Sequence, residues 1–173
     1  MAERKGVNSL VTTVEGQDLV MERNFYASKE ELFKAFSQSD RLESWWGPKG
    51  WKTENKKFEF KPNGIWLYCM KCTDRNQGDF FGQESWGKAV YEEIDSPNKI
   101  VYIDSFADKE GNTISEMPSL LITVHFIEQG ENTKLTIRSR FASSEDLQQV
   151  MEMGVVEGMS SQFDCLDEFL SKN

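Results

Sequence analysis

The sequence predicts an α+β domain in which a curved antiparallel sheet of about six or seven strands wraps around a long C-terminal helix. The middle of the chain alternates apolar and polar residues with the period of two that strands show, and turn residues separate these segments. Two short segments of helical period follow the first strand, and the apolar period becomes helical again after Ser143. Because a sheet that is apolar on one face must cover that face, we expect the last helix to lie on it.

The first strand and the two short helices have clear boundary signals. Residues 19–25 alternate as a strand does. Ser28 and Glu31 form a capping box at the start of the first helix, because their side chains can pair with backbone groups that a helix start leaves unpaired. A second short helix should start at Ser39 and end near Trp46, at a glycine-proline pair.

The strands that follow are separated by turns and one longer loop. Pro62-Asn63-Gly64 has the composition of a turn between antiparallel strands. Residues 74–87 are polar and contain glycine, so most of this segment should form a loop. The segments expected to form the strands of the sheet are residues 56–61, 65–70, 88–94, 100–106, 120–128 and 134–141.

The last helix is expected to be continuous. It should be capped at Ser143 and run over residues 145–170, which corresponds to a length of about 39 Å. Gly154 and Gly158 lie four residues apart on its apolar stripe, and each costs about 1 kcal/mol relative to alanine inside a helix. They indicate either a hollow for a ligand or close packing of the helix on the aromatic strand of residues 65–70.

Composition restricts the class of protein. We expect residues 1–9 to be a disordered N-terminus and residues 10–173 to form a single domain. The formal charge of −9 argues against a nucleic-acid partner, which requires a basic surface. The chain has no run of about 18 apolar residues and no secretory leader, so we expect no membrane span and a cytoplasmic location.

Neither a metal nor a cofactor is expected. Cys69 and Cys72 have C-x-x-C spacing, but they fall at the end of a strand-like segment, where residues three apart point to opposite faces. No second cysteine or histidine pair completes a zinc site. The sequence also has no phosphate-binding loop and no dinucleotide fingerprint.

Trp45-Trp46-Gly47-Pro48-Lys49-Gly50 is the most specific motif of the chain. It resembles the signature of the bacterial single-domain homologues of the activator of heat-shock protein 90 ATPase, within the START-like (SRPBCC, birch-pollen-allergen-like) superfamily. The similarity covers residues 19–170 and includes the segment 61–66, similar to the family's glycine turn and aromatic strand. The resemblance implies the helix-grip fold, in which relatives bind lipids, hormones or polyketides in a cavity between sheet and helix. It also implies two other kinds of role found among relatives, which are regulation of a chaperone ATPase and cyclase or hydrolase activity.

The residues expected to line such a cavity lie on the aromatic turn, on the inner face of the sheet or on the last helix. In one strand, alternation places Trp66, Tyr68 and Met70 on the same face, and the Tyr68 hydroxyl could orient a ligand. Trp46 is either a ligand contact or, like Trp45, a structural plug at one end of the core. The full set of ligand-binding candidates is Trp46, Trp66, Tyr68, Met70, Val124, Phe126, Gly154, Gly158 and Met159.

The sequence assigns no catalytic residue. His125, the single histidine, alternates with apolar residues in a way that places it on the outer face of its strand. Glu93 and Asp104 could form an acid/base pair for proton transfer. Alternatively, they are edge or surface carboxylates that pair with Arg138 or Arg140.

Three hypotheses about function follow, and the first is favoured. It is non-enzymatic binding of an apolar small molecule, either lipid-like or aromatic, with a stress-related role implied by the family. The second is a protein-interaction module that regulates a chaperone ATPase or another partner. The third is a cyclase or hydrolase, which requires a titratable group inside the cavity with a perturbed pKa. We expect a monomer or a homodimer in each case.

Overall fold

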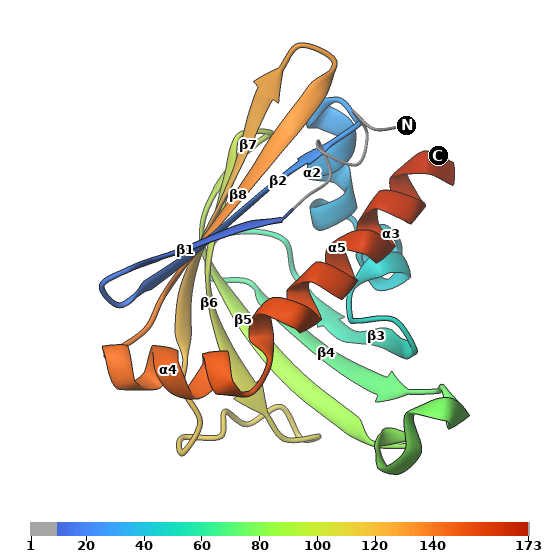
Figure 1. The fold of residues 1–173 in the computed structure, drawn as a ribbon, viewed down its shortest axis with the longest axis vertical. Helices are drawn as coiled ribbons and strands as arrows, with labels where there is room; N and C mark the ends of the chain where they lie inside the picture. Colours follow the sequence, from blue (N-terminus) through green and yellow to red (C-terminus); the bar gives the residue numbers. More distant parts are fainter. Residues whose placement is uncertain (1–9, 173) are drawn as a thin grey trace.

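The computed structural model describes residues 10–172, which form one eight-stranded antiparallel sheet with helices on one side (Figure 1). The strand order in space is β1-β2-β8-β7-β6-β5-β4-β3. The strands are β1 (Val11–Glu15), β2 (Asp18–Phe25), β3 (Trp51–Phe58), β4 (Ile65–Cys72), β5 (Glu84–Asp95), β6 (Lys99–Ala107), β7 (Leu120–Gln129) and β8 (Asn132–Arg140). The expected disorder of residues 1–9 concerns residues outside the described part of the chain.

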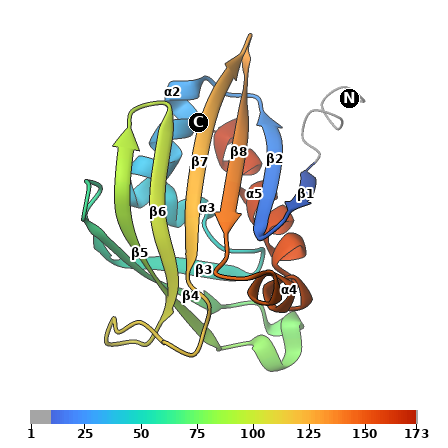
Figure 2. The same cartoon turned by 90° about the vertical axis from the view of Figure 1, so that its left-hand side faces the viewer.

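The helices α2 (Lys29–Ser37), α3 (Ser39–Trp45), α4 (Ser144–Glu152) and α5 (Val155–Lys172) cover the concave side of the sheet. The short 3-10 helix η1 (Arg75–Phe80) lies in the connection between β4 and β5. Figure 1 shows α5 crossing the sheet next to α3, and Figure 2 shows the strands in front of α2, α3 and α5. The predicted α+β class and the curved sheet around a C-terminal helix are therefore confirmed. None of the helices within residues 10–172 is long and apolar enough to cross a membrane.

The sheet has one strand more than the upper expectation, because β1 was not predicted. This strand lies at the edge and pairs only with β2, through a turn in which Gly16 has a φ of 64°. Its two valines, Val11 and Val14, are 55% and 52% exposed. A strand with no buried face has no alternation of apolar and polar residues, so the pattern that identified the other strands is missing here.

Two other strands start earlier than expected. β3 begins at Trp51, several residues before the predicted segment 56–61. Within the expected loop of residues 74–87, the chain forms η1 and then enters β5 at Glu84. Side chains of β3 alternate between intermediate and full exposure, so this edge strand shows little apolar contrast in sequence.

The prediction of one continuous C-terminal helix is wrong. The chain breaks between α4 and α5 at Gly154, whose φ of 86° lies in the left-handed region that ends many helices. The Gly154 N–H donates to the Met151 carbonyl at 3.1 Å, as expected where a helix closes. The predicted cap at Ser143 is confirmed, because its side chain accepts a hydrogen bond from the Asp146 N–H. Gly154 therefore acts as a helix terminator and not as a gap in a helix face.

The break separates two apolar cores. The smaller one joins α4 to β2 through Leu19, Met21, Leu147 and Val150. The main core lies under α2, α3 and α5, and it includes Trp45, which is 1% exposed. The indole N–H of Trp45 donates to the Ala35 carbonyl at 2.9 Å, so this ring has the structural role expected of it. The space between the two cores, beneath the junction of α4 and α5, holds the candidate site.

Candidate functional site

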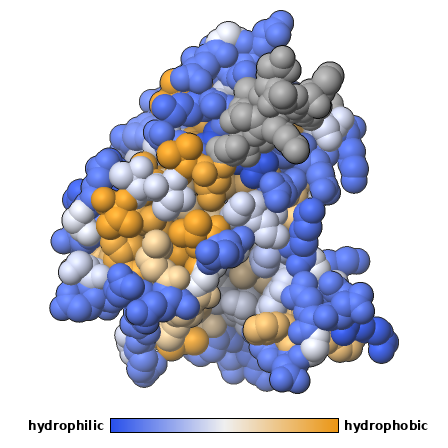
Figure 3. Space-filling model, in the orientation of Figure 1, coloured by the Kyte–Doolittle hydropathy of each residue, from blue (hydrophilic) through white to orange (hydrophobic). Residues whose placement is uncertain are grey.

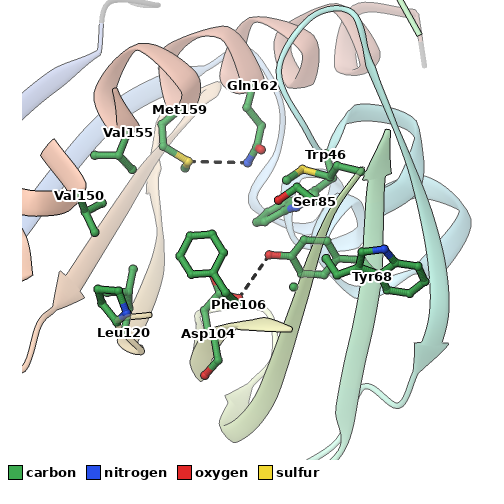
Figure 4. Close-up of a pocket in the computed structure, with 15 residues that line it drawn as sticks. Trp46, Tyr68, Ser85, Asp104, Phe106, Leu120, Val150, Val155, Met159 and Gln162 are labelled. Carbon is green, nitrogen blue, oxygen red and sulfur yellow. Dashed lines mark hydrogen bonds between the residues drawn. The ribbon is translucent and has the colours of Figure 1, made fainter. Parts of the chain in front are cut away.

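An apolar cavity of about 200 Å³ lies between the ends of β4, β5 and β6 and the junction of α4 and α5. From the sheet, the wall includes Tyr68, Met70, Trp86 and Phe106, and from the helices it includes Val150, Val155, Met159 and Gln162. Figure 4 shows Tyr68 and Phe106 on the strand side of the cavity and Val155, Met159 and Gln162 on the helix side. Figure 3 shows the molecular surface hollowed near the lower centre of the view, with apolar atoms along one side of the hollow.

A second cavity of about 100 Å³ lies deeper in the domain and shares part of the same wall. It is enclosed by Phe36, Tyr102, Ile122 and Ile137, among others. The residues that border both cavities are Trp46, Asp104, Leu120, Val155 and Met159. The outer and inner cavities are therefore adjacent and share this part of the wall.

The tryptophan turn is fixed to the last helix at the cavity wall. The Gly47 N–H donates to the buried Gln162 side chain at 2.9 Å, and the Trp46 carbonyl accepts from the Thr53 hydroxyl at 2.7 Å. The Trp46 ring meets Tyr68 edge to face at a centroid distance of 5.7 Å. Because Gly47 has a φ of 97°, glycine suits the conformation that turns the chain at this point. The motif thus places Trp46 at the cavity by backbone geometry as well as by packing.

Asp104 is the one ionisable carboxyl group in the described wall of either cavity. The Tyr68 hydroxyl donates a hydrogen bond to its Oδ1 at 3.3 Å (Figure 4). Burial raises the pKa of Asp104 to about 7, although hydrogen bonds from the Tyr68 side chain and the Ser105 backbone act in the opposite direction. Burial also raises the pKa of Tyr68, so this hydroxyl stays protonated and remains a donor at neutral pH.

The wall has no positive charge to balance this carboxyl group. Neither cavity wall contains a lysine, arginine or histidine among the described residues. Within residues 10–172, Asp104 also takes part in no ion pair. An unbalanced carboxyl group in an apolar cavity is the kind of group that specific sites use to orient a ligand.

The predicted pairing of Glu93 with Asp104 does not occur. Glu93 is exposed, and its carboxylate pairs with the Lys99 ammonium group at 3.3 Å. The register between β5 and β6 shifts between Tyr91 and Glu93. The alternative pairing with Arg138 or Arg140 is also wrong, because both arginines bind Asp18, at 2.6 Å and 2.9 Å. His125 is exposed on the outer face of β7, as its alternation indicated.

The inward position of Asp104 follows from the alternation along β6. Ile100, Tyr102, Asp104 and Phe106 alternate along β6, and the first two are buried. The same period of two that places Tyr102 in the core places the Asp104 carboxyl on the inner face. A carboxyl group at an inward position of an otherwise apolar strand face was therefore visible in the sequence alone.

The structure brings together only part of the predicted set of ligand-binding residues. Trp46, Tyr68, Met70 and Met159 border the outer cavity. Trp66, Val124 and Phe126 are buried in the main core and border neither cavity. They lie on the inner face of the sheet as expected, but at positions where neighbouring aromatic rings fill the space. The Phe126 ring packs against Phe33 and Phe36 at centroid distances of 5.2 Å and 5.3 Å. The Trp66 indole N–H donates to the Asn55 side chain at 2.8 Å.

Neither helical glycine forms the hollow. Gly154 follows the end of α4, and a Cβ at Gly158 would meet no atom within 4 Å, so Gly158 does not pack closely on the aromatic strand. Gly158 is also not among the residues that line either cavity. The glycine that packs closely on an aromatic ring is Gly87 of β5, where a Cβ would overlap the Tyr68 ring. This contact depends on the pairing of β4 with β5, in which Tyr68 lies opposite Gly87, and no local pattern in the sequence indicates it.

Metal binding finds no support in the described residues. Cys69, Cys72 and Cys165 are free thiols, and residues 10–172 contain no group of three or more histidine, cysteine or acidic side chains placed to hold a metal ion. The lining of the outer cavity is mainly apolar, and its polar side chains include the Asp104 carboxyl group, the Tyr68 phenol and the Gln162 amide.

Comparisons with known proteins agree with the motif. The model of the family described as activator of Hsp90 ATPase homolog 1-like protein matches residues 26–171. Among solved structures, protein Ms6760 from Mycobacterium smegmatis is 27% identical, with a TM-score of 0.81 over 95% of this chain and 96% of that chain. A protein from Arthrobacter aurescens is 29% identical, with a TM-score of 0.84 over 96% of this chain and 93% of that chain. No curated protein matches this chain.

Proposed function

This chain belongs to the activator of Hsp90 ATPase homolog 1-like family, and we propose that it binds a small, largely apolar molecule in the cavity beneath the α4–α5 junction. The observation that carries the proposal is the apolar cavity of about 200 Å³, with its deeper extension of about 100 Å³. Burial of apolar ligand surface would supply the driving force, at about 25 cal/mol per Å² before the costs of association.

The size of the cavity limits the ligand. Sites for drug-sized ligands measure roughly 300–1,000 Å³, and an apolar cavity of roughly 150 Å³ is enough for benzene. The outer and inner cavities together lie at the lower end of the first range. We therefore propose a compact aromatic or aliphatic ligand with one short chain, and not a diacyl lipid.

The test is to block the cavity without disturbing the helix that covers it. Val155 borders both cavities, whereas Glu157, two residues along α5, is exposed and borders neither. Val155→Trp should therefore abolish ligand uptake, and Glu157→Trp is the matched control that should retain it. The protein and both variants would be purified natively, extracted with organic solvent and analysed by mass spectrometry for a stoichiometric compound.

Propylbenzene gives a second readout when the purified protein is empty. It should raise the melting temperature of the wild type and of Glu157→Trp in a saturable manner, and it should leave Val155→Trp unchanged. If the wild type yields no compound and propylbenzene does not stabilise it, the proposal fails.

A protein-interaction role is the second candidate, and one surface feature favours it. Ile103 and Leu121 face each other across β6 and β7 on the outer side of the sheet, and they are 36% and 38% exposed. Regulation of a heat-shock protein 90 ATPase through this face would require no ligand. An ATPase assay with the bacterial chaperone, comparing the wild type with Leu121→Glu, tests it, because this variant leaves the cavity intact.

The enzymatic alternative receives less support. Asp104 is a titratable group inside the cavity with a raised pKa, as the enzymatic hypothesis requires. The titratable groups next to it are Tyr68 and Tyr102, and burial raises the pKa of both, so neither can act as a base at neutral pH. We propose that the carboxyl group serves recognition. A cytoplasmic location, a stress-related role and a monomeric or homodimeric state remain predictions from the sequence.

A further inference from the structure

The Asp104 carboxyl group gives the cavity a preference for charge as well as for shape. It stands at the boundary between the outer and inner cavities, where any ligand that fills both must pass it. Around it the wall is aromatic: Trp46, Tyr68, Trp86 and Phe106 all border the outer cavity. A carboxyl group among aromatic rings has the two features that bind an ammonium group, an opposite charge and π faces.

We propose that the ligand is a small aromatic or aliphatic amine whose ammonium group binds the Asp104 carboxylate, and that the cavity rejects carboxylates and phosphates of the same shape. This inference rests on the proposed binding function and adds the chemical class of the ligand. The described wall contains no lysine, arginine or histidine that could pair with an anion. An anionic ligand would also lie against the Asp104 carboxylate, and like charges at such a distance repel each other strongly in an apolar surrounding.

The Asp104 carboxyl group has acceptor capacity left for such a ligand. An ionised carboxylate offers about four acceptor positions; the Tyr68 hydroxyl uses one of them on Oδ1 and the Ser105 backbone N–H uses another, so about two remain. The Tyr68 ring is in turn fixed by close packing on Gly87, so the hydroxyl holds the carboxyl group in one orientation. An ammonium group has three donors and could bind the free acceptor positions while its apolar part occupies the aromatic wall.

The other described side chains that line the two cavities are uncharged at neutral pH, so a bound ligand would be the main influence on the charge state of Asp104. β4 contributes the Tyr68 hydroxyl, and burial raises the pKa of this phenol and of Tyr102, so both stay neutral. Tyr91 of β5 also has a pKa raised by burial. β7 contributes Leu120 to the wall, and the helices contribute Val150, Val155, Met159 and Gln162, none of which titrates. No cation in the described wall competes with the ligand for the carboxylate.

The affinity for an amine should increase as the pH rises. The amine binds the ionised carboxylate, whose pKa in the empty cavity is about 7. The binding-competent fraction therefore rises from about 9% at pH 6 to about 91% at pH 8, and the affinity rises about tenfold with it. A neutral ligand of the same shape gains nothing from ionisation, so its affinity should not rise over this range.

Three probes of matched size test the inference by calorimetric titration. Phenethylamine carries the ammonium group, propylbenzene replaces it with a methyl group, and 3-phenylpropionate replaces it with a carboxylate. At pH 8 we expect phenethylamine to bind at least about tenfold more tightly than propylbenzene, as a hydrogen-bonded charge should. The 3-phenylpropionate should bind most weakly. Asp104→Asn should weaken phenethylamine binding about tenfold or more and leave propylbenzene binding within about twofold.

Asp104→Asn is a suitable variant because the amide oxygen can still accept from the Tyr68 hydroxyl. Glu93→Gln, which removes an exposed carboxylate from the outer side of β5, is the matched control and should bind all three probes as the wild type does. An independent readout is the titration of ¹³C-labelled aspartate carboxyl groups by NMR, in which phenethylamine should move the Asp104 midpoint below that of the empty protein.

The outcomes separate this inference from the proposed function. If propylbenzene binds as tightly as phenethylamine, or if 3-phenylpropionate binds most tightly, the amine inference is wrong while the binding function stands. If none of the three probes binds saturably, the binding function fails and the inference fails with it. An unchanged Asp104 midpoint in the presence of bound phenethylamine would also overturn the inference.

Discussion

The clearest physical test of the site is the stability of Asp104→Asn as a function of pH. Burial favours the protonated form of Asp104, with a pKa of about 7 in the folded protein against 3.8 for the ordinary carboxyl group. This carboxyl group therefore destabilises the folded state as the pH rises from about 4 to about 7, which is the opposite of a carboxylate held in an ion pair. The neutral asparagine removes that penalty, so the variant should gain on the wild type as the pH increases.

The magnitude follows from linkage. With about 1.4 kcal/mol per pKa unit, the full shift corresponds to a penalty of about 1.7 kcal/mol at pH 5 and about 4 kcal/mol at pH 8. Asp104 is only half-buried as a residue and lies in a cavity that water can enter, so the real values should be smaller. We expect the difference in free energy of unfolding between variant and wild type to grow by about 1–2.5 kcal/mol between pH 5 and pH 8.

Urea unfolding at several pH values measures this difference directly, with circular dichroism as the signal. Glu93→Gln serves as the control, because an exposed carboxylate should change the free energy of unfolding by no more than about 0.5 kcal/mol at either pH. If the advantage of Asp104→Asn is the same at pH 5 and pH 8, or becomes smaller, the carboxyl group is solvated and the reasoning behind the site is wrong.

Three further predictions concern stability, and urea unfolding measures each. Gly87→Ala should cost about 1–3 kcal/mol, because its Cβ would overlap the Tyr68 ring; an unchanged stability would mean that this ring moves freely. Gly158→Ala should stabilise by about 0.4–1 kcal/mol, since helix α5 has open space there, and a loss of stability would contradict this packing. Asp18→Asn should cost about 1–3 kcal/mol at pH 7, because hydrogen bonds from Arg140 and a second arginine lower the pKa of Asp18. That cost should disappear as the pH falls through the lowered pKa, whereas a cost that persists in strong acid would exclude the ion pairs as its cause.

Local sequence signals predicted most of the framework because their causes are local. Ser28 accepts a hydrogen bond from the Glu31 N–H at 3.1 Å, as its capping box indicated. Alternation located β2 and β4 to β8 because each buries one face. The break at Gly154 was missed because the apolar stripe continues from α4 into α5, and only the backbone conformation separates the two helices.

The site was harder to predict because a cavity is the small volume that remains after the side chains have filled most of the space between sheet and helices. Trp66 and Phe126 lie on the expected face of the sheet, but neighbouring rings fill the space next to them. Tyr68 and Met159 lie where side chains of β5, β6 and α5 leave a gap. Which of these inward positions borders empty space depends on side chains from at least three separate elements, and no short stretch of sequence contains that information.

The hydrogen bond between Gly47 and Gln162 joins residues that are 115 positions apart, and it ties the turn that carries Trp46 to helix α5, so that both parts of the cavity wall are held together. The wall therefore exists only when α5 is docked, so ligand binding and helix docking are linked equilibria. A ligand at 100 times its dissociation constant would stabilise the docked state by about 2.7 kcal/mol. Amide hydrogen exchange in α5 should accordingly slow by up to about a hundredfold when the cavity is filled, which makes the last helix a reporter of occupancy.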